Sequence, residues 1–260
     1  MKYFGGCDVG STYTKAVILD ENGKMVADTT IKSKINSEAS AVAAMAEVCE
    51  KAGLKSSKDL EYLIGTGYGR NKVPFADENI SEISCHAMGV HVTDPSVKAI
   101  IDIGGQDVKG ISVDTDGTVK NFAMNDKCAA GTGRFFEAMA RSFEMSLPEF
   151  SKLALTAKNV IPITAQCTVF AESEVISLIA NNEEKPDIAA GVCRAVAGKA
   201  YSLMRRVGLE GAYMMTGGVA QNPGVVRAVE ELIGEKLFIC EDPEIVGATG
   251  AALLALEKSE

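Results

Sequence analysis

The chain is poor in positive charge and lacks long apolar runs. Its 260 residues include 26 Lys and Arg against 35 Asp and Glu, which gives a net charge of −9. This balance argues against binding to a nucleic-acid backbone, which needs clustered Lys and Arg, and against docking on an anionic membrane. The longest nearly apolar run, 245–256, is too short to span a bilayer. The first residues carry no signal-peptide pattern, so we expect a cytoplasmic protein.

Two widespread nucleotide-binding motifs and a disulfide framework are also missing. The pattern G-x-x-x-x-G-K-[ST] does not occur, so the chain is not a P-loop NTPase. Gly65, Gly67 and Gly69 have the wrong spacing for a dinucleotide fingerprint, which disfavours NAD. The seven cysteines are odd in number and form no C-x-x-C pair, so in a cytoplasm they do not indicate disulfides.

What the chain does contain is one short phrase that occurs twice. The pattern D-hydrophobic-G-x-x-x-x-K stands at 8–15 and again at 102–109, an offset of 94 residues from position 8 to position 102. The same offset relates Asp20 to Asp114 and Gly23 to Gly117. Self-similarity at a fixed spacing indicates an internal duplication. A glycine turn lets backbone N–H groups approach an anion, so two such turns would hold a polyphosphate from both sides.

Strands and helices alternate along the rest of the chain, which predicts an α/β protein. We expect strands at 4–9, 15–19, 25–31, 61–64, 99–103, 108–113, 118–124, 213–215 and 237–240. We expect helices at 37–52 (with Ser37 as N-cap), 82–91, 133–143, 147–157, 170–181, 188–207, 222–233 (with Pro223 at its first position) and 247–256. The expected division is an N-terminal lobe of residues 1–95 plus 247–260 and a C-terminal lobe of residues 96–246.

A third glycine-rich turn, T-G-G-V-A-Q-N at 216–222, follows a predicted strand. Together with the two copies it resembles the actin, sugar-kinase and heat-shock-chaperone ATPase superfamily. The resemblance implies two duplicated ribonuclease-H-like lobes that close on ATP. It implies phosphate loops at Gly10, Ser11, Thr12, Tyr13, Thr14 and Lys15 and at Gly104, Gly105, Gln106 and Asp107, an adenosine motif at Gly217, Gly218, Gln221 and Asn222, and a pocket closed by Gly247, Ala248 and Gly250.

The acidic residues of the two phrases have chemistry that suits phosphoryl transfer. Asp8 and Asp102 are suited to holding Mg²⁺ through water, because Mg²⁺ keeps several waters and takes few carboxylates. Gln106 or Asp107 could orient the attacking water, since positioning and charge stabilisation dominate this reaction. The alternative for Asp107 is a carboxylate that caps a turn.

Two cysteines precede predicted helices in distinctive phrases. Cys128 lies in K-C-A-A-G-T-G-R-F and Cys167 in C-T-V-F-A-E-S-E-V. A thiolate at a helix N-terminus, or an iron–sulfur cluster bound to it, is stabilised by the macrodipole and the free N–H groups. The alternative is that both are buried packing residues. We expect that packing role for the other five cysteines, Cys7, Cys49, Cys85, Cys193 and Cys240.

Taken together, these phrases resemble the ATP-dependent activators of 2-hydroxyacyl-CoA dehydratases over nearly the whole chain. The resemblance implies a homodimer with one [4Fe–4S] cluster on its two-fold axis, ligated by Cys128 and Cys167 of each chain. A cluster takes about four thiolates, and two chains related by a two-fold supply four. Gly131, Thr132 and Gly133 are assigned to the nucleotide site. Residues 165–166 read Ala-Gln where we expect Ser-Thr, which would alter hydrogen bonds to the sulfurs.

The same resemblance implies an ATP-driven one-electron donor. Reduced ferredoxin or flavodoxin would supply the electron, and ATP hydrolysis would change the angle between the lobes. The dehydratase would then receive one strongly reducing electron and form a ketyl radical anion from its acyl-CoA substrate. An exposed cluster implies oxygen sensitivity and an anaerobe that ferments amino acids. The alternatives are an activator of a benzoyl-CoA-type reductase, a cluster-free small-molecule kinase and a non-catalytic nucleotide switch.

Overall fold

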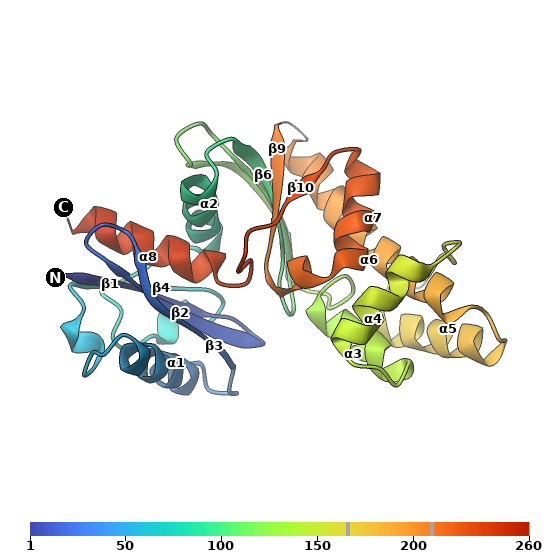
Figure 1. Ribbon diagram of the computed structural model, residues 1–260, viewed down its shortest axis with the longest axis horizontal. Coiled ribbons are helices and arrows are strands. Elements are labelled where there is room, and N and C mark those ends of the chain that lie inside the picture. Colours follow the sequence, from blue (N-terminus) through green and yellow to red (C-terminus); the bar gives the residue numbers. More distant parts are fainter. Residues whose placement is uncertain (165–166, 209–210, 260) are drawn as a thin grey trace. The chain divides into compact units, whose positions relative to one another are not determined.

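Two five-stranded sheets form the framework of the protein (Figure 1). The computed structural model describes residues 1–164, 167–208 and 211–259. The chain divides into two compact units, each of which contains one sheet. The first unit comprises Met1–Val97, Val113–Lys120 and Glu244–Glu260, and the second comprises Lys98–Ser112 and Asn121–Pro243.

The two sheets have the same strand order, which supports the duplication seen in the sequence. In both, the second strand of the unit lies between the first and the third, and the first strand also borders the fourth. The first sheet runs β3 (Met25–Lys32), β2 (Tyr13–Asp20), β1 (Tyr3–Val9), β4 (Tyr62–Thr66), β5 (Glu78–Asn79). The second runs β8 (Val119–Asn125), β7 (Val108–Val113), β6 (Val97–Ile103), β9 (Ala212–Thr216), β10 (Leu237–Phe238).

The antiparallel register of the two hairpins is also the same. Asp8 on β1 lies opposite Lys15 on β2, and Asp102 on β6 lies opposite Lys109 on β7. The repeated phrase therefore places an acidic and a basic side chain on one cross-strand position in each unit, which is where side chains of neighbouring strands interact most strongly.

Helices cover the sheets, and the second unit contains more of them. The first unit has α1 (Ser37–Lys51), α2 (Glu82–Thr93) and α8 (Val246–Lys258). The second has α3 (Gly133–Ser142), α4 (Leu147–Leu153), α5 (Thr168–Ala180), α6 (Lys185–Val207) and α7 (Pro223–Ile233), with short 3₁₀ turns η3 (Ala154–Thr156) and η4 (Gly218–Gln221).

None of the helices in the described part of the chain is both long enough and apolar enough to cross a membrane.

Strand β2 shows how the alternation of its side chains builds the first unit. Ala16 and Ile18 belong to the hydrophobic cluster formed with α1, whereas Val17 and Leu19 belong to the cluster formed with α8. Successive strand residues point to opposite faces of a sheet, so a continuous apolar run buries both faces. The sheet is therefore covered on one face by α1 and on the other by α8.

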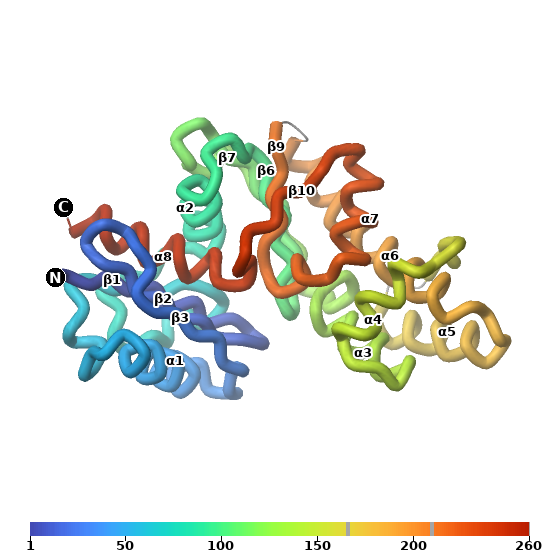
Figure 2. Tube along the Cα trace, in the orientation of Figure 1, coloured from blue at the N-terminus to red at the C-terminus, as the bar shows by residue number. Residues whose placement is uncertain are grey.

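The C-terminal helix α8 returns to the first unit, where both chain ends lie (Figure 2). It packs closely against α2 and β1, and glycines lie where the backbones approach each other. A β-carbon on Gly6 of β1 would overlap the carbonyl oxygen of Ala248, and one on Gly250 of α8 would overlap that of Cys85. These glycines allow backbone-to-backbone contact, which a larger residue would prevent.

Several element boundaries differ from the sequence predictions for local reasons. The N-cap of α1 is Asn36 rather than Ser37, because the Asn36 side chain accepts a hydrogen bond from the N–H of Ala39 at 3.0 Å. The helix expected over 147–157 ends at Leu153 and continues as η3. The strand expected over 237–240 ends at Phe238. Pro223 does open α7, with Asn222 as its N-cap.

The tip of the second hairpin belongs to the first unit, although the expected lobe of residues 96–246 would include it in the second. Its turn residue Gly117 has φ +81°, and a β-carbon there would press on the His91 ring of α2. The hairpin tip is thus packed on α2, while most of its two strands belong to the second sheet.

We predict that Gly250→Ala lowers the free energy of unfolding by about 1–3 kcal/mol, because the added methyl group has no space beside the Cys85 carbonyl. The matched control is Gly198→Ala on α6, where a β-carbon meets nothing within 4 Å. That change should stabilise the protein by roughly 0.5–1 kcal/mol through helix propensity. Urea unfolding of both variants checks the prediction, and equal effects would contradict it.

Candidate functional site

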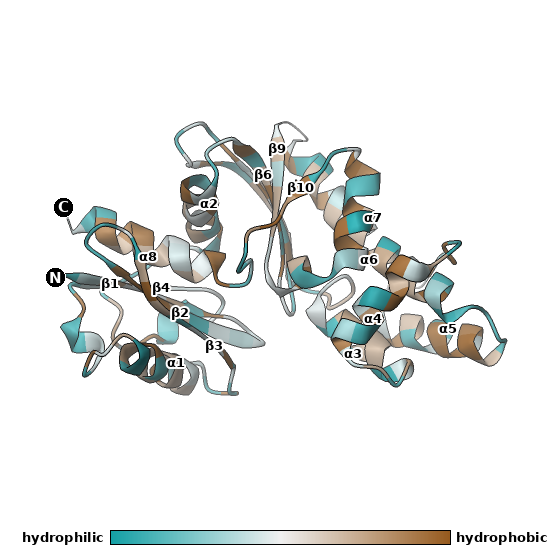
Figure 3. Ribbon diagram, in the orientation of Figure 1, coloured by the Kyte–Doolittle hydropathy of each residue, from teal (hydrophilic) through white to brown (hydrophobic). Residues whose placement is uncertain are grey.

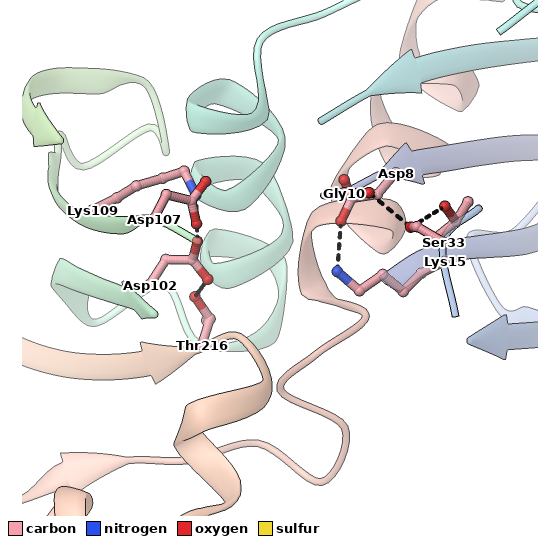
Figure 4. A network of polar contacts seen from close by, with 9 residues as sticks. Asp8, Gly10, Lys15, Ser33, Asp102, Asp107, Lys109 and Thr216 are labelled. Carbon is pink, nitrogen blue, oxygen red and sulfur yellow. Dashed lines mark hydrogen bonds and ion pairs between the residues drawn. The ribbon is translucent and has the colours of Figure 1, made fainter. Parts of the chain in front are cut away.

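The first phosphate turn lies between β1 and β2 and is closed by backbone and side-chain contacts. The N–H of Gly10 donates to the Tyr13 carbonyl at 3.1 Å, and Ser33 Oγ donates to the Gly10 carbonyl at 2.8 Å. Lys15 Nζ lies 3.1 Å from Asp8 Oδ2, as Figure 4 shows. The side chains of this ion pair are only 18% and 9% exposed. The turn therefore has a fixed backbone with a partly buried ion pair beside it.

Two further features of the first turn concern glycine and threonine. Gly67, which follows β4, has φ +87° and passes directly against the Asp8 carboxylate and the Val9 carbonyl, so a side chain at this position would collide with both. The hydroxyl oxygen of Thr12 is buried and has no hydrogen-bond partner within the described residues. A buried polar group without a hydrogen-bond partner costs free energy. The Thr12 hydroxyl therefore points to a polar ligand that would form the hydrogen bond.

The second phosphate turn, between β6 and β7, repeats this arrangement in a more buried form. Lys109 Nζ lies 2.8 Å from Asp102 Oδ2 and 2.9 Å from Asp107 Oδ2 (Figure 4). The side chains of Lys109 and Asp102 are 3% and 4% exposed, whereas that of Asp107 is 23% exposed. The N–H of Gly104 donates to the Asp107 carbonyl at 3.0 Å. One lysine thus neutralises two carboxylates at this turn.

Strand β9, which borders β6 in the sheet, ends in a threonine and is followed by a glycine, and both lie beside the second turn. Thr216 Oγ1, at the end of β9, donates to Asp102 Oδ1 at 3.0 Å. Gly217 has φ +82°, and a β-carbon there would overlap the Ile103 carbonyl. Since Gly67 follows β4 in the same way that Gly217 follows β9, each acidic residue is approached by a glycine from the neighbouring strand.

The start of α3 is fastened to the second turn. The N–H groups of Gly133 and Arg134 donate to the carbonyls of Gly104 and Gly105 at 2.9 and 3.0 Å. The Gln106 side chain faces Arg134, and its amide oxygen, turned toward the guanidinium, accepts from Nη1 at 2.7 Å and from Nε at 3.0 Å. The second turn is therefore joined to the start of α3 by backbone hydrogen bonds and by a side-chain contact.

Several residues assigned to the nucleotide site have packing or capping roles. Asn222 Oδ1 accepts from the N–H groups of Gly224 and Val225 and so caps α7. Thr132 is the N-cap of α3, and its hydroxyl donates to the Ala129 carbonyl at 2.6 Å. These contacts explain why Asn222 and Thr132 occupy their positions, without a ligand. Gly247 is explained in the same way, because a β-carbon there would come too close to the His86 ring. By contrast, a β-carbon on Gly218 would meet nothing within 4 Å.

The cysteines fall into two groups by exposure. Burial raises the pKa of the Cys85 and Cys193 thiols to about 12, and it also raises the pKa values of the buried Cys7 and Cys49. The packing role expected for these four is confirmed by their burial. Cys128 and Cys240 are half-buried, and Cys167 is exposed.

Both cysteines of the distinctive phrases belong to the second unit. Cys167 is the N-cap of α5, as the helix-start argument requires. Cys128 lies in the loop before α3, four residues ahead of the N-cap Thr132, so the helix-start expectation is not met at this cysteine. The Cys128 carbonyl accepts from Asn125 Nδ2 at 3.1 Å. Helices α3 and α5 pack against each other. The Ala-Gln pair at 165–166 lies outside the described residues.

Sequence reasoning missed Ser33, Gly67, Arg134 and Thr216 as parts of these turns. A signal for two of them was present, since Thr66-Gly67 and Thr216-Gly217 are the same dipeptide at the ends of equivalent strands. The spacing of Gly67 to Gly65 and Gly69 does not fit a dinucleotide motif and gives no hint of its role. Its true neighbour is Asp8, which is distant in sequence.

The paired aspartate–lysine turns on two sheets of equal topology point to one known family. The model of the BadF/BadG/BcrA/BcrD ATPase family matches residues 6–255. The chain belongs to this family. One of the subunits of benzoyl-CoA reductase from Thauera aromatica is a more distant relative, 32% identical over 210 residues that span 78% of this chain and 74% of that protein.

Other relatives of this ATPase family match over nearly the full length. The activator of lactoyl-CoA dehydratase from Anaerotignum propionicum is 46% identical over 258 residues, which cover 99% of both chains. The structure of component A of (R)-2-hydroxyglutaryl-CoA dehydratase from Acidaminococcus fermentans gives a TM-score of 0.94 at 44% identity and covers 100% of this chain and 99% of that one. The activator of the 2-hydroxyisocaproyl-CoA dehydratase from Clostridium difficile with bound ADPNP gives 0.93 at 42% identity, covering 99% and 95%. The expected fold and the resemblance to dehydratase activators are confirmed.

We predict that Lys109→Met lowers the free energy of unfolding by about 3–5 kcal/mol, because it leaves the buried Asp102 carboxylate without its cation. Lys15→Met should cost less, since the Asp8 pair is more exposed. The control is Lys258→Met, which removes an exposed pair with Glu78 and should cost no more than about 1 kcal/mol. Urea unfolding without nucleotide gives the order, and equal losses for the three variants would refute it.

Proposed function

We propose that this protein is an ATP-hydrolysing activator that works as a homodimer holding one [4Fe–4S] cluster and delivers one low-potential electron to a 2-hydroxyacyl-CoA dehydratase. The observation that carries the proposal is the presence, in one chain, of two aspartate–lysine turns and of two cysteines ahead of helices, the half-buried Cys128 and the exposed Cys167. High identity to proteins named as dehydratase activators supports it. Reduced ferredoxin or flavodoxin is the proposed electron donor, and the cytoplasm of an amino-acid-fermenting anaerobe is the proposed setting.

The two turns are the proposed ligands of the ATP phosphates. Their backbone N–H groups suit an anion, and the buried Thr12 hydroxyl suits a phosphate oxygen or a water bound to it. Asp8 and Asp102 would hold hydrated Mg²⁺ through its waters, which is compatible with the lysine that each carboxylate already contacts. Asp107, the more exposed carboxylate beside Lys109, would orient the attacking water, and Gln106 would hold Arg134 and α3.

The cysteines fit half of a cluster site. Among the described residues, no three or more Cys, His, Asp or Glu side chains come together in a way that could hold a metal ion. A [4Fe–4S] cluster takes about four thiolates, so a chain that contributes Cys128 and Cys167 fits as one half of a two-fold site. When bound, the cluster would supply a one-electron carrier of low potential. The chain's part is to present the half-buried Cys128 and the exposed Cys167 ahead of two helices, α3 and α5, that pack against each other.

Exposed apolar side chains on α5, the helix that Cys167 caps, support the proposed dimer. Val169, Phe170 and Ile176 of α5 are 65%, 69% and 52% exposed. Figure 3 shows hydrophobic colour over this helix. Exposed apolar patches of this kind mark association surfaces, and a two-fold contact uses the same patch on both chains.

A dehydratase is preferred to a benzoyl-CoA-type reductase as the partner. The dehydratase activators match 99% of this chain at 42–46% identity, whereas the benzoyl-CoA reductase component matches 78% at 32%. In the proposed reaction the transferred electron turns the acyl-CoA thioester of the partner's substrate into a ketyl radical anion, which permits loss of the hydroxyl group. The electron is returned at the end of each turnover.

Anaerobic purification followed by iron analysis and a visible spectrum tests this proposal. About four iron atoms per two chains are expected, with the broad visible absorption of an iron–sulfur cluster. A colourless, iron-free dimer that hydrolyses ATP would refute the electron-transfer role. Phosphorylation of a small hydroxyl compound by that iron-free protein would favour the kinase instead.

We predict that Cys128→Ala and Cys167→Ala each abolish the iron content, because a cluster at a two-fold axis then loses two of its four thiolates. Cys85→Ala is the matched control and should keep its iron, since its thiol is buried and its pKa is raised to about 12. Iron analysis after reconstitution reads out all three variants. Loss of iron in Cys85→Ala, or its retention in Cys128→Ala, would contradict the assignment.

We predict that Asp107→Asn lowers the rate of ATP hydrolysis by about 10²–10⁴-fold, the usual contribution of a group that positions or deprotonates the nucleophile. Asp114→Asn, at an exposed position of the same hairpin, removes the same charge and should leave the rate unchanged. Steady-state phosphate release measures both. An unchanged rate for Asp107→Asn would remove this residue from the proposed mechanism.

A further inference from the structure

The segment that leads to Cys167 has no regular secondary structure, yet it is held firmly. Residues 157–164 lie between η3 and α5 and form neither helix nor strand. Free backbone of this kind usually moves more than the elements that it joins. Here two carboxylates, one on α6 and one on α5, accept hydrogen bonds from its backbone.

The first anchor is Asp187, near the start of α6, which is only 6% exposed. Its side chain accepts from the N–H groups of Lys158 and Asn159 at 2.9 and 3.1 Å and from Asn159 Nδ2 at 3.1 Å. Its carbonyl accepts from the N–H of Ile161 at 3.2 Å. The hydrogen bonds from Asn159 lower the pKa of Asp187, so the carboxylate stays ionised and keeps these donors. This anchor fixes the beginning of the segment.

The second anchor is Glu174, in the middle of α5. Both of its carboxylate oxygens accept from the N–H of Thr164, at 3.1 and 3.0 Å, and Oε1 also accepts from the Thr164 hydroxyl at 2.8 Å. The contact ties Thr164 to α5, the helix whose N-cap is Cys167, three residues further along the chain. Hydrogen bonds to an ionised acceptor are stronger than neutral ones, so a single side chain can hold this segment against the helix.

The neighbouring carboxylate of the same phrase contacts α3, the helix that follows Cys128. Glu172 Oε1 accepts from Ser142 Oγ at 3.4 Å, at the last residue of α3. Helix α3 follows Cys128 in the chain and packs against α5. The two glutamates of A-E-S-E-V therefore connect α5 to the segment before one cysteine and to the helix after the other.

We propose that Glu174 is a positioning residue for Cys167: by holding Thr164 against α5, the helix that Cys167 caps, it fixes the geometry in which Cys167 presents its sulfur to the iron–sulfur cluster. The inference rests on the proposed function for the cluster itself. Groups that orient a metal ligand without touching the metal typically change metal affinity by about 10–100-fold when removed. Asp187 holds the beginning of the segment 157–164, and Glu174 holds its last residue, Thr164.

The test uses the reconstituted dimer under anaerobic conditions. Glu174→Ala should lose iron to a ferrous chelator about 10–100-fold faster than the wild type and should shift the reduction midpoint potential of the cluster. Glu174→Gln should lie between them, because its carbonyl oxygen keeps part of the hydrogen bonding. Thr164→Val, which removes only the hydroxyl donor, should also be intermediate. Glu183→Ala, an exposed residue just beyond α5, is the charge-matched control and should behave as the wild type.

The outcomes separate this inference from the proposal on which it rests. An iron-free wild-type protein would overturn both. A wild-type protein with about four iron atoms per two chains, together with wild-type chelation rate and potential in Glu174→Ala, would overturn only the role of Glu174. Urea unfolding of the iron-free variants should change little, since the contact is exposed. A large loss of stability together with an unshifted potential would identify Glu174 as a merely structural residue.

Discussion

The structure depends on one interaction that is made twice, the cross-strand contact between an aspartate and a lysine at the mouth of a glycine turn. In the second unit both partners are almost fully buried, so neither charge is tolerable without the other. The contact fixes the hairpin register, because a shift of one strand by one residue would move its charged side chain to the opposite face of the sheet from its partner. It also determines what can lie beside the aspartate, which is why a glycine follows β4 and β9.

Much of this arrangement could be predicted from the sequence because it is local. The hairpins follow from Asn-Gly and Asp-Gly turns between apolar strands, and the helices from their caps and composition. The contacts of Asp102 with Thr216 and of Asp8 with Gly67 could not be predicted, since each joins residues far apart in the chain. Strand β5, with two residues, is too short to produce a periodic pattern. The capping role of Asn36 was missed because Asn and Ser are nearly equal in that position.

The cysteines show a different limit of what can be predicted from the sequence. Their phrases single out Cys128 and Cys167 by context, and burial separates the four packed thiols from the half-buried Cys128 and Cys240 and the exposed Cys167. The phrase did not show which atoms hold the segment before Cys167, although one of them belongs to Glu174, within the same phrase. From the sequence alone, a glutamate on a helix is expected to be solvated, because the segment that folds against it is not known. The role of such a glutamate therefore follows from the groups that it contacts in the folded chain and not from its residue type.

The hydrogen bonds between the second turn and α3 have an electrostatic consequence. The carbonyls of Gly104 and Gly105 accept from the first N–H groups of α3, and each belongs to a peptide group whose N–H lies on the opposite edge. Hydrogen bonds in such a chain polarise one another, by about 10–30% per bond. A phosphate drawn to the N–H edge would therefore strengthen the bonds on the carbonyl edge, at the positive end of the α3 macrodipole. The charge of a bound nucleotide would then be felt in the cysteine-bearing part of the second unit through polarisation of peptide groups, without requiring any helix to shift.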